Sequence, residues 1–318
     1  MTPRTRGFHH ITMVASNAAQ TIGFYRDVLG LSLLHQTPAK DDDDTEHLFF
    51  TTGAGKPGTL INFLEWPDVR RGRWGVGGIH HLALGCTDER AQLKWKRWLV
   101  DHGVAVSGPY DRGWFHSIYF VDPDGQVLEI ATAGPGYQLD EPIDQLGTTV
   151  QMPRESQLRG SRDEAEIAAR THPEPIIELS DDMRLDGIHH ITGMTNDVRA
   201  MDDFYRAALG LRLVKRSVNQ DDPDTPHWFW ANYDGREVSA HSSLTMFGWP
   251  TSNYRARAGV GQTHHIAFRA ENIAELRAWH ELLQTMDVDV TEPLQREYFT
   301  SIFLTAPDGL LMEIASDT

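Results

Sequence analysis

A pair of adjacent histidines opens a predicted β-strand at four places in the chain, and this repeat constrains the fold strongly. Each pair is followed by an apolar stretch, and together the pairs hold half of the 16 histidines: His9-His10, His80-His81, His189-His190 and His264-His265. A repeat of this kind predicts four copies of one supersecondary unit. It also places histidine side chains on the first strand of every copy.

Two of the four units also end alike. Residues 119–131 and 303–315 each read as a strand, a Pro-Asp-Gly turn and a second strand. The second strand carries one carboxylate in an apolar run, Glu129 in one unit and Glu313 in the other. Burying a carboxylate costs several kcal/mol unless it is paired or bound to a metal. Each glutamate lies 48 residues after the second histidine of its unit, which favours a site over a coincidence.

Strand geometry separates the two histidines of each pair, because successive side chains point to opposite faces. The first histidine shares its face with large residues such as Ile11 and Met13. The second shares its face with small residues such as Ala83 and Ala267, which leave room for a cavity. We therefore predict six metal ligands: His10, His81, Glu129, His190, His265 and Glu313. The first histidines are predicted to be structural or to support these ligands: His9, His80, His189 and His264.

Length and composition indicate a soluble protein of about two domains, on the usual scale of ~150 residues each. The chain has 318 residues, a hydrophobic fraction of 40% and no apolar run long enough to span a membrane. Its net charge of −16 argues against nucleic acid as a partner. The single cysteine, Cys86, excludes an intrachain disulfide, and the first residues lack an apolar signal-peptide core. We therefore expect a cytoplasmic protein.

The order of predicted elements indicates an α+β fold of four βαβββ modules. The modules are predicted at residues 7–66, 78–134, 187–250 and 262–316. Residues 1–147 would hold the first pair of modules and residues 185–318 the second pair. Residues 148–184 break the pattern and are predicted to be an interdomain linker on the surface.

Paired modules of this kind resemble the vicinal oxygen chelate superfamily, which includes glyoxalases, bleomycin resistance proteins and extradiol dioxygenases. Within it, residues 111–119 (Asp-Arg-x-x-Phe-x-Ser-Ile-Tyr), 187–192 and 211–223 resemble the hydroquinone-type ring-cleaving dioxygenases. Residues 139–147 are similar to the tail that closes members of this family. The resemblance implies two half-barrel cups, each built from two modules, and a centre of two histidines and one glutamate that holds Fe(II) or Mn(II).

Carried over in chain order, the family's one ligand set falls on His10, His265 and Glu313. This chain departs from the family by carrying a second set, His81, Glu129 and His190. Arg112 and Tyr119 stand at the positions of the family's active-site arginine and tyrosine, whereas the fourth module has Arg296 and Phe303. The same six ligands are used whether modules pair within the halves or across them, and the resemblance favours the crossed pairing.

The resemblance implies a non-haem Fe(II) (or Mn(II)) extradiol-type dioxygenase that inserts O₂ into a hydroquinone or catechol ring. Two histidines and one carboxylate on one side of a metal leave positions for substrate and O₂. Tyr119 or a nearby histidine would transfer protons, and Arg112 would stabilise an anionic ring. The expected partners are a small aromatic substrate and O₂, with neither nucleic acid nor a membrane. A homo-oligomer is compatible with the sequence.

Two other functions are compatible with the same fold. A glyoxalase-like isomerase or lyase would need a fourth ligand, a glutamate from the last strand of the other module. Glu65 stands near such a position, although it is more typical of an exposed acid at a strand end. A non-catalytic small-molecule binder would need no metal ligands, and six well-placed ligands weigh against it.

Overall fold

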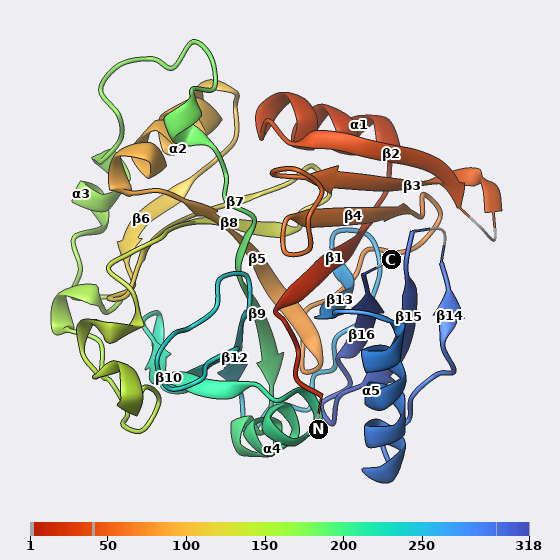
Figure 1. Ribbon diagram of the computed structural model, residues 1–318. Coiled ribbons are helices and arrows are strands. Elements are labelled where there is room, and N and C mark those ends of the chain that lie inside the picture. The colour runs from red at the N-terminus through yellow and green to blue at the C-terminus, as the bar shows by residue number, and fades with distance from the viewer. Residues whose placement is uncertain (1–2, 40–41, 297, 318) are drawn as a thin grey trace.

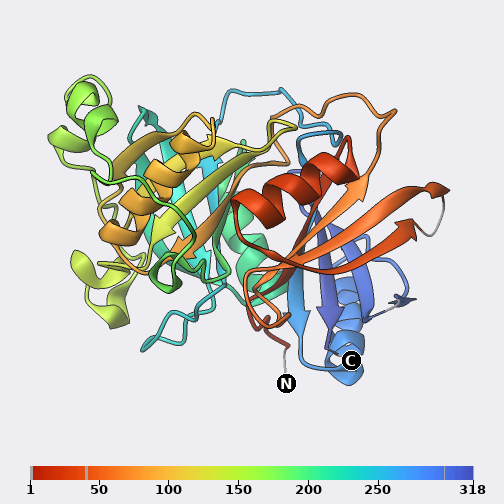
Figure 2. The ribbon, with the colours of Figure 1, turned by 90° about the horizontal axis from the view of Figure 1, so that it is seen from above.

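The computed structural model describes residues 3–39, 42–296 and 298–317, and it confirms an α+β fold of two curled sheets with eight strands each (Figure 1). The first cup has the strand order β14-β15-β16-β13-β1-β4-β3-β2. The second cup has the order β10-β11-β12-β9-β5-β8-β7-β6. The cups lie side by side, as the view from above shows (Figure 2). No helix in the described ranges is long and apolar enough to cross a membrane.

The four modules share one order of elements. Module one contains β1 (Phe8–Ala15), α1 (Ala18–Ile22), β2 (Ser32–Ala39), β3 (Asp42–Thr51) and β4 (Leu60–Glu65). Module two contains β5 (Gly78–Cys86), α2 (Glu89–Asp101), β6 (Ser107–Asp111), β7 (His116–Val121) and β8 (Val127–Thr132). Module three contains β9 (Ile188–Thr195), α4 (Val198–Phe204), β10 (Arg212–Asn219), β11 (Asp222–Ala231) and β12 (Ser243–Gly248). Module four contains β13 (Thr263–Ala270), α5 (Ile273–Thr285), β14 (Leu294–Gln295), β15 (Thr300–Thr305) and β16 (Leu311–Ser316).

Each module helix begins at an Asn or Asp whose side chain accepts a backbone N–H of the first turn. The four capping residues are Asn17, Asp88, Asp197 and Asn272. Two helices then widen into a π-helical turn, at Gly23–Val28 and at Tyr205–Leu209. In both helices the wide turn coincides with an adjacent Phe and Tyr that are buried, so the departure from a regular α-helix recurs with this sequence pair.

The modules pair across the halves of the chain. Strand β1 of module one pairs antiparallel with β13 of module four, and β5 of module two pairs antiparallel with β9 of module three. Strands from the two ends of the chain, red and blue in Figure 1, therefore form one sheet. Within each half the contacts come from other elements: the Tyr25 hydroxyl of module one donates to Asp122 Oδ2 of module two at 3.1 Å.

The segment between the halves runs past β6 and α2 at the left of Figure 1 and contains one short α-helix, α3 (Glu164–Ala169), with 3₁₀ turns at Glu155–Gln157 and Asp181–Met183. The ammonium group of Lys96, on α2, donates to the carbonyl oxygens of Ile167, Ala168 and Arg170 at 2.8–3.0 Å. Lys96 therefore satisfies the carbonyl groups at the end of α3 and fixes this segment to module two.

Candidate metal centres and active site

The crossed pairing places two second-position histidines and one glutamate in the middle of each cup. In the second cup Ala83 on β5 pairs with His190 on β9 at one side and with Glu129 on β8 at the other. In the first cup Ala267 on β13 stands in the same way between His10 and Glu313. The small alanine leaves space between the two ligand side chains, as strand parity predicts.

The spacing of the candidate ligand atoms fits a metal ion in both cups. In the second cup Glu129 Oε2 lies 2.9 Å from His81 Nε2 and 3.3 Å from His190 Nε2, and the two nitrogens are 3.4 Å apart. The three distances in the first cup are 3.1, 3.1 and 3.4 Å, for the set His10, His265 and Glu313. Metal–ligand bonds of about 2.1 Å at right angles place neighbouring ligand atoms about 3 Å apart. Each set therefore has the dimensions of one face of an octahedron.

Burial makes both glutamates unusual. Glu129 and Glu313 are at most 1% exposed, and the Oε2 atom of each has no hydrogen-bond partner among the described residues. Burial by itself raises the pKa of each carboxyl group, but the adjacent histidines outweigh it and hold the pKa well below its ordinary value. An ionised, buried carboxylate oxygen that faces two imidazole nitrogens is suited to a divalent cation.

The first histidine of every pair contacts the second through its ring. The two Nδ1 atoms are 2.8 Å apart in all four pairs, so the Nε2 atom of the second histidine is left to face the metal position. Burial, and then the neighbouring imidazole, lowers the pKa of His9, His80 and His189 to about 3 and that of His264 to about 4. The first histidines are therefore neutral and can accept the Nδ1–H of the candidate ligand.

The second cup brings Tyr119 and Arg112 to its histidine–glutamate set. The Tyr119 ring centroid is 5.5 Å from that of His81, and the Arg112 guanidinium carbon lies 5.2 Å from the Tyr119 ring centroid. Burial raises the pKa of the Tyr119 hydroxyl, although Arg112 opposes the shift. The Ser117 hydroxyl donates to Glu129 Oε1 at 2.5 Å and so holds the oxygen that does not face the histidines.

A cavity of about 1180 Å³ opens onto this set. Its lining includes His80, His81, His190, Arg112 and Tyr119, together with the aromatic residues Trp74, Trp114, Phe115, Phe229 and Phe247. Aromatic walls with a few convergent polar groups are typical of a small-molecule site. Residues 151–164 also line the cavity, so the predicted surface linker has a second role as one of its walls.

The motif at residues 211–223 explains how Arg112 is positioned. Gln220 accepts a hydrogen bond from Arg112 Nη1 at 2.9 Å and donates to the carbonyl oxygen of Asp111 at 2.9 Å. Asp221 Oδ2 lies 3.9 Å from the same Arg112 nitrogen. The β10–β11 turn therefore holds the arginine beside Tyr119.

The first cup has a different set of neighbours. Phe303 occupies the tyrosine position, 5.2 Å from the His265 ring, and the Arg296 guanidinium lies 5.3 Å from the Phe303 ring. Ser301, at the position of Ser117, has no hydrogen-bond partner for its hydroxyl among the residues that the structure describes. The counterpart of the Gln220 turn includes residues 40 and 41, which lie outside the described residues.

His227 is a residue of the cavity that the sequence patterns do not single out. Its Nε2 lies 2.9 Å from Thr245 Oγ1, and the side chain lines the cavity. Burial, with the nearby His190 and His81, holds the pKa of His227 well below its ordinary value. The available signal was the repeat of Asp-Thr-x-His at 44–47 and 224–227.

Glu65 is not placed as a fourth ligand. Its Oε1 accepts the backbone N–H of Ala18 at 2.7 Å, and its Oε2 accepts that of Glu46 at 3.2 Å. The residue is half-buried at the start of α1, so it serves as a helix cap rather than as an exposed acid. The positions on β4 and β12 that correspond to Glu129 and Glu313 are Asn62 and Thr245. Neither residue is a carboxylate.

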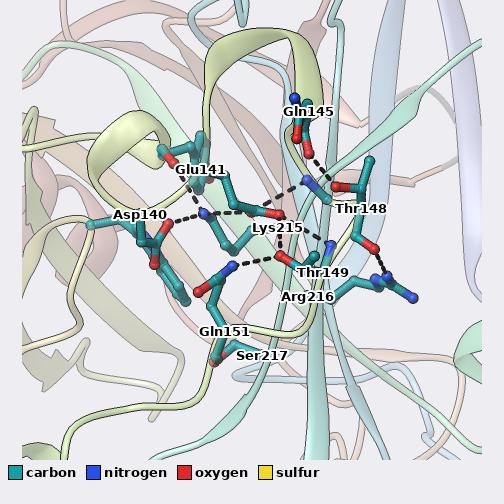
Figure 3. Close-up of polar contacts among 12 residues, drawn as sticks. Asp140, Glu141, Gln145, Thr148, Thr149, Gln151, Lys215, Arg216 and Ser217 are labelled. Atoms are coloured by element: carbon teal, nitrogen blue, oxygen red, sulfur yellow. Dashed lines mark hydrogen bonds and ion pairs between the residues drawn. The ribbon is translucent and has the colours of Figure 1, made fainter.

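A buried ion cluster fixes the tail segment (residues 137–149) against β10 (Figure 3). Lys215 is fully buried and donates to Asp140, to Glu141 Oε2 at 2.8 Å and to the Tyr137 carbonyl oxygen at 3.0 Å. Glu141 Oε1 accepts from the Thr149 hydroxyl at 2.9 Å. Two of the stretches that resemble the dioxygenases, 139–147 and 211–223, are thus in direct contact.

Comparison with known proteins agrees with the geometry. Residues 7–130 and 187–314 match the model of the Glyoxalase/Bleomycin resistance protein/Dioxygenase superfamily. The chain belongs to this superfamily. A solved structure titled "putative dioxygenase", from Bacillus subtilis, superimposes with a TM-score of 0.75 at 25% identity, covering 99% of this chain and 86% of that one.

Two relatives carry names that describe an activity. The Bacillus subtilis protein "Putative ring-cleaving dioxygenase MhqO" is 27% identical over 100% of this chain and 86% of its own length. The chlorohydroquinone/hydroquinone 1,2-dioxygenase of Sphingobium indicum is 24% identical over 98% of this chain and 85% of its own length. The likeness to named dioxygenases extends over both halves of the superfamily member described here, and it supports an enzyme.

Proposed function

We propose that this superfamily member is a metal-dependent dioxygenase that opens a dihydroxylated aromatic ring, of hydroquinone or catechol type, at the centre of the second cup. The observation that carries the proposal is the combination of one buried histidine–glutamate set with Tyr119, Arg112 and a ring-lined cavity. Relatives named as ring-cleaving dioxygenases over the whole chain support the same reaction class.

His81, His190 and Glu129 would hold Fe(II), with Mn(II) as the alternative, through Nε2, Nε2 and Oε2. When bound, the metal supplies open coordination positions and lowers the pKa of a ring hydroxyl that reaches it. The set in the first cup fits a metal equally well, and we propose that it binds one without turning over substrate. The difference lies in the groups around each set.

Tyr119 and Arg112 act on the ring oxygen and on the negative charge that develops. Burial keeps the Tyr119 hydroxyl protonated, so it can donate a hydrogen bond to the substrate oxygen and then a proton. The Arg112 guanidinium, held by Gln220, stabilises negative charge beside it. Phe115 and Phe247 line the cavity beside His190 and His81 and offer flat apolar surfaces for the ring.

The test is an anaerobic titration of the Fe(II)-loaded chain with hydroquinones and catechols, followed by addition of O₂. We expect metal-dependent O₂ uptake and a ring-opened product that contains both oxygen atoms. Protein that binds metal but consumes no O₂ with any dihydroxybenzene would overturn the proposal. Thiol-dependent isomerisation by the nickel or zinc form would support the glyoxalase-like alternative instead.

A further inference from the structure

The cavity extends well beyond the groups that the ring-opening reaction needs. Its volume of about 1180 Å³ exceeds the ~300–1,000 Å³ typical of pockets for drug-sized ligands. A single dihydroxybenzene ring is much smaller than such a ligand. The additional space is bounded by the wall segment, which we define as residues 151–164.

Gln157, in the wall segment, lines this cavity and carries a buried amide N–H₂ group. The residue is 6% exposed, and its Oε1 accepts the backbone N–H of Arg154 at 2.7 Å, which fixes the orientation of the amide. Its Nε2 has no hydrogen-bond partner within the described ranges. A Cβ atom built on Gly113 would lie 3.8 Å from this nitrogen, so the donor stands beside the segment that carries Arg112.

Arg162 presents a second donor. Its side chain is 6% exposed, and two of its nitrogens bind Glu164 and Asp221, each at 2.7 Å. The remaining nitrogen, Nη1, is buried and has no partner in the part of the chain that the structure describes. The two carboxylates already balance the guanidinium charge. The group that pairs with Nη1 must therefore be a hydrogen-bond acceptor, but it can be neutral.

Tyr110 connects Arg162 to the residues beside the metal position. Its ring centroid is 6.2 Å from that of Tyr119 and 4.4 Å from the Arg162 guanidinium carbon. Asp221 also links the two arginines, since it lies 2.7 Å from Arg162 and 3.9 Å from Arg112. A ring bound beside Tyr119 would direct a substituent along Tyr110 toward the wall segment.

We propose that Gln157 and Arg162 form a subsite for a hydrogen-bond-accepting oxygen on a side chain of the substrate ring. The inference rests on the proposed function, because it takes the ring to bind at the His81–Glu129–His190 set. The substrate class is then a dihydroxylated ring with a side chain that ends in a carboxylate or an amide carbonyl. A purely apolar side chain of equal length would leave both buried donors without an acceptor.

The wall segment is held in place before any ligand binds. The Ser217 hydroxyl donates to the carbonyl oxygen of Gln151 at 2.7 Å, and the Arg159 N–H donates to that of Gln220 at 2.9 Å. Lys96 holds the end of α3 that follows. A subsite on a fixed wall loses little conformational entropy on binding, which favours selectivity between substituents.

The test compares three ligands of matched length: propylhydroquinone, hydroquinone-propanoate and hydroquinone-propanamide. Anaerobic titration followed by tryptophan fluorescence gives their dissociation constants, in wild type and in two variants. Gln157→Glu keeps the acceptor for Arg154 but replaces the amide donor, and Arg162→Lys keeps the charge but removes Nη1. Gln145→Glu, on an exposed side chain away from the cavity lining, is the control for added charge.

We expect wild type to bind the propanoate and the propanamide about tenfold more tightly than propylhydroquinone, the scale of one charge-assisted hydrogen bond. Gln157→Glu and Arg162→Lys should each reduce this preference, and Gln145→Glu should keep it. A preference for the propanoate alone would restrict the substrate class to anions. Equal affinity for all three ligands, no binding of any, or a preference that both variants retain would overturn the subsite.

Measurement of oxygen uptake distinguishes failure of the subsite from failure of the proposed function. Turnover of unsubstituted hydroquinone with no preference among side chains would leave the dioxygenase standing and remove the subsite. A preference that depends on Gln157 without any O₂ uptake would leave the subsite standing and remove the dioxygenase.

Discussion

In the second cup Tyr119 and Arg112 stand beside the metal position, and a large cavity opens onto it; in the first cup Phe303 replaces the tyrosine. The ligand spacing is nevertheless almost the same in both cups, within 0.2 Å for each pair of atoms. The ligand geometry follows from the strand pairing, which is repeated, whereas the proposed acid–base group is the side chain of one residue, Tyr119. The two cups therefore share their candidate ligands but differ in the groups around them, so the proposed metal binding and the proposed catalysis can be tested separately within one chain.

The cups also differ at matching positions on their outer strands. Lys215 on β10 is buried in a cluster of carboxylates that fixes the tail segment. The matching residue on β2 is His35, which stacks on Tyr298 with 4.5 Å between the ring centroids. The tail and wall segments both follow module two, so only the second cup receives them.

The largest expected effect comes from the two carboxylates. Glu129→Gln should reduce turnover by more than ~100-fold. Loss of a residue that only hydrogen-bonds to a metal ligand costs up to ~100-fold, and Glu129 is proposed to bind the metal itself. Glu313→Gln, the matched control, should leave turnover within about threefold of wild type, because the first cup lacks the tyrosine. Metal content should fall from two per chain to one in both variants. Full metal content in both would show that the glutamates are structural.

The second effect concerns the tyrosine. Tyr119→Phe should lower kcat by ~10²-fold, the usual scale for a positioned proton-transfer group, with metal content unchanged. The reciprocal variant, Phe303→Tyr, should not change turnover by the second cup. Unchanged kcat in Tyr119→Phe would remove the hydroxyl from the mechanism and weaken the contrast between the cups.

A third prediction concerns the buried ion cluster. Lys215→Met should lower the free energy of unfolding by ~3–5 kcal/mol, because it leaves buried carboxylate charge, chiefly on Glu141, without its cation. His35→Leu is the matched variant at an exposed position of the first cup. It should change the free energy of unfolding by less than ~0.5 kcal/mol. Urea unfolding measures both. Equal effects would mean that the tail segment is not held by Lys215.

The smallest effect is a pH dependence. Asp122 accepts a hydrogen bond from the Tyr25 hydroxyl. The hydroxyl of Tyr205, which corresponds to Tyr25, has no partner among the described residues, and Ala306 stands at the sequence position that corresponds to Asp122. Burial, together with the charge of Asp124, raises the pKa of Asp122 from 3.8 to about 6, against the backbone and Tyr25 hydrogen bonds that lower it.

A raised pKa in the folded state stabilises the fold below pH 3.8 and ceases to do so as the pH passes about 6. Asp122→Asn carries no charge at this position. Its Tm relative to that of wild type should therefore increase as the pH is raised from about 4.5 to about 7.5, a range that spans the raised pKa. Ala306→Asn provides the matched change in the other half and should show no such trend. A Tm difference for Asp122→Asn that is independent of pH would contradict the assignment.

Much of this architecture could be predicted from the sequence. The period of two along a strand separates His81 from His80, and the four modules follow from the repeat. The crossed pairing could not be derived from the residues, because His10 can meet either His81 or His265 with the same parity. Only the antiparallel pairing of the first strands decides between them.

The wall segment could not be predicted as part of a site for a different reason. Residues 151–164 have no apolar periodicity, and their position depends on distant contacts with Ser217 and Gln220. His227 was missed because a single histidine on a strand is more often structural than functional. Its role depends on Thr245 and on the cavity, which no local pattern reveals.

The most direct test of the account is to ask which centre the substrate reaches. Cobalt(II) can be loaded anaerobically into wild type, Glu129→Gln and Glu313→Gln, and hydroquinone added while the cobalt absorption spectrum is recorded. Because the substrate is proposed to bind in the second cup, hydroquinone should change the spectrum of wild type and of Glu313→Gln but should leave the spectrum of Glu129→Gln unaltered. A spectral change in Glu129→Gln, with none in Glu313→Gln, would place the chemistry in the first cup and contradict the proposed active site.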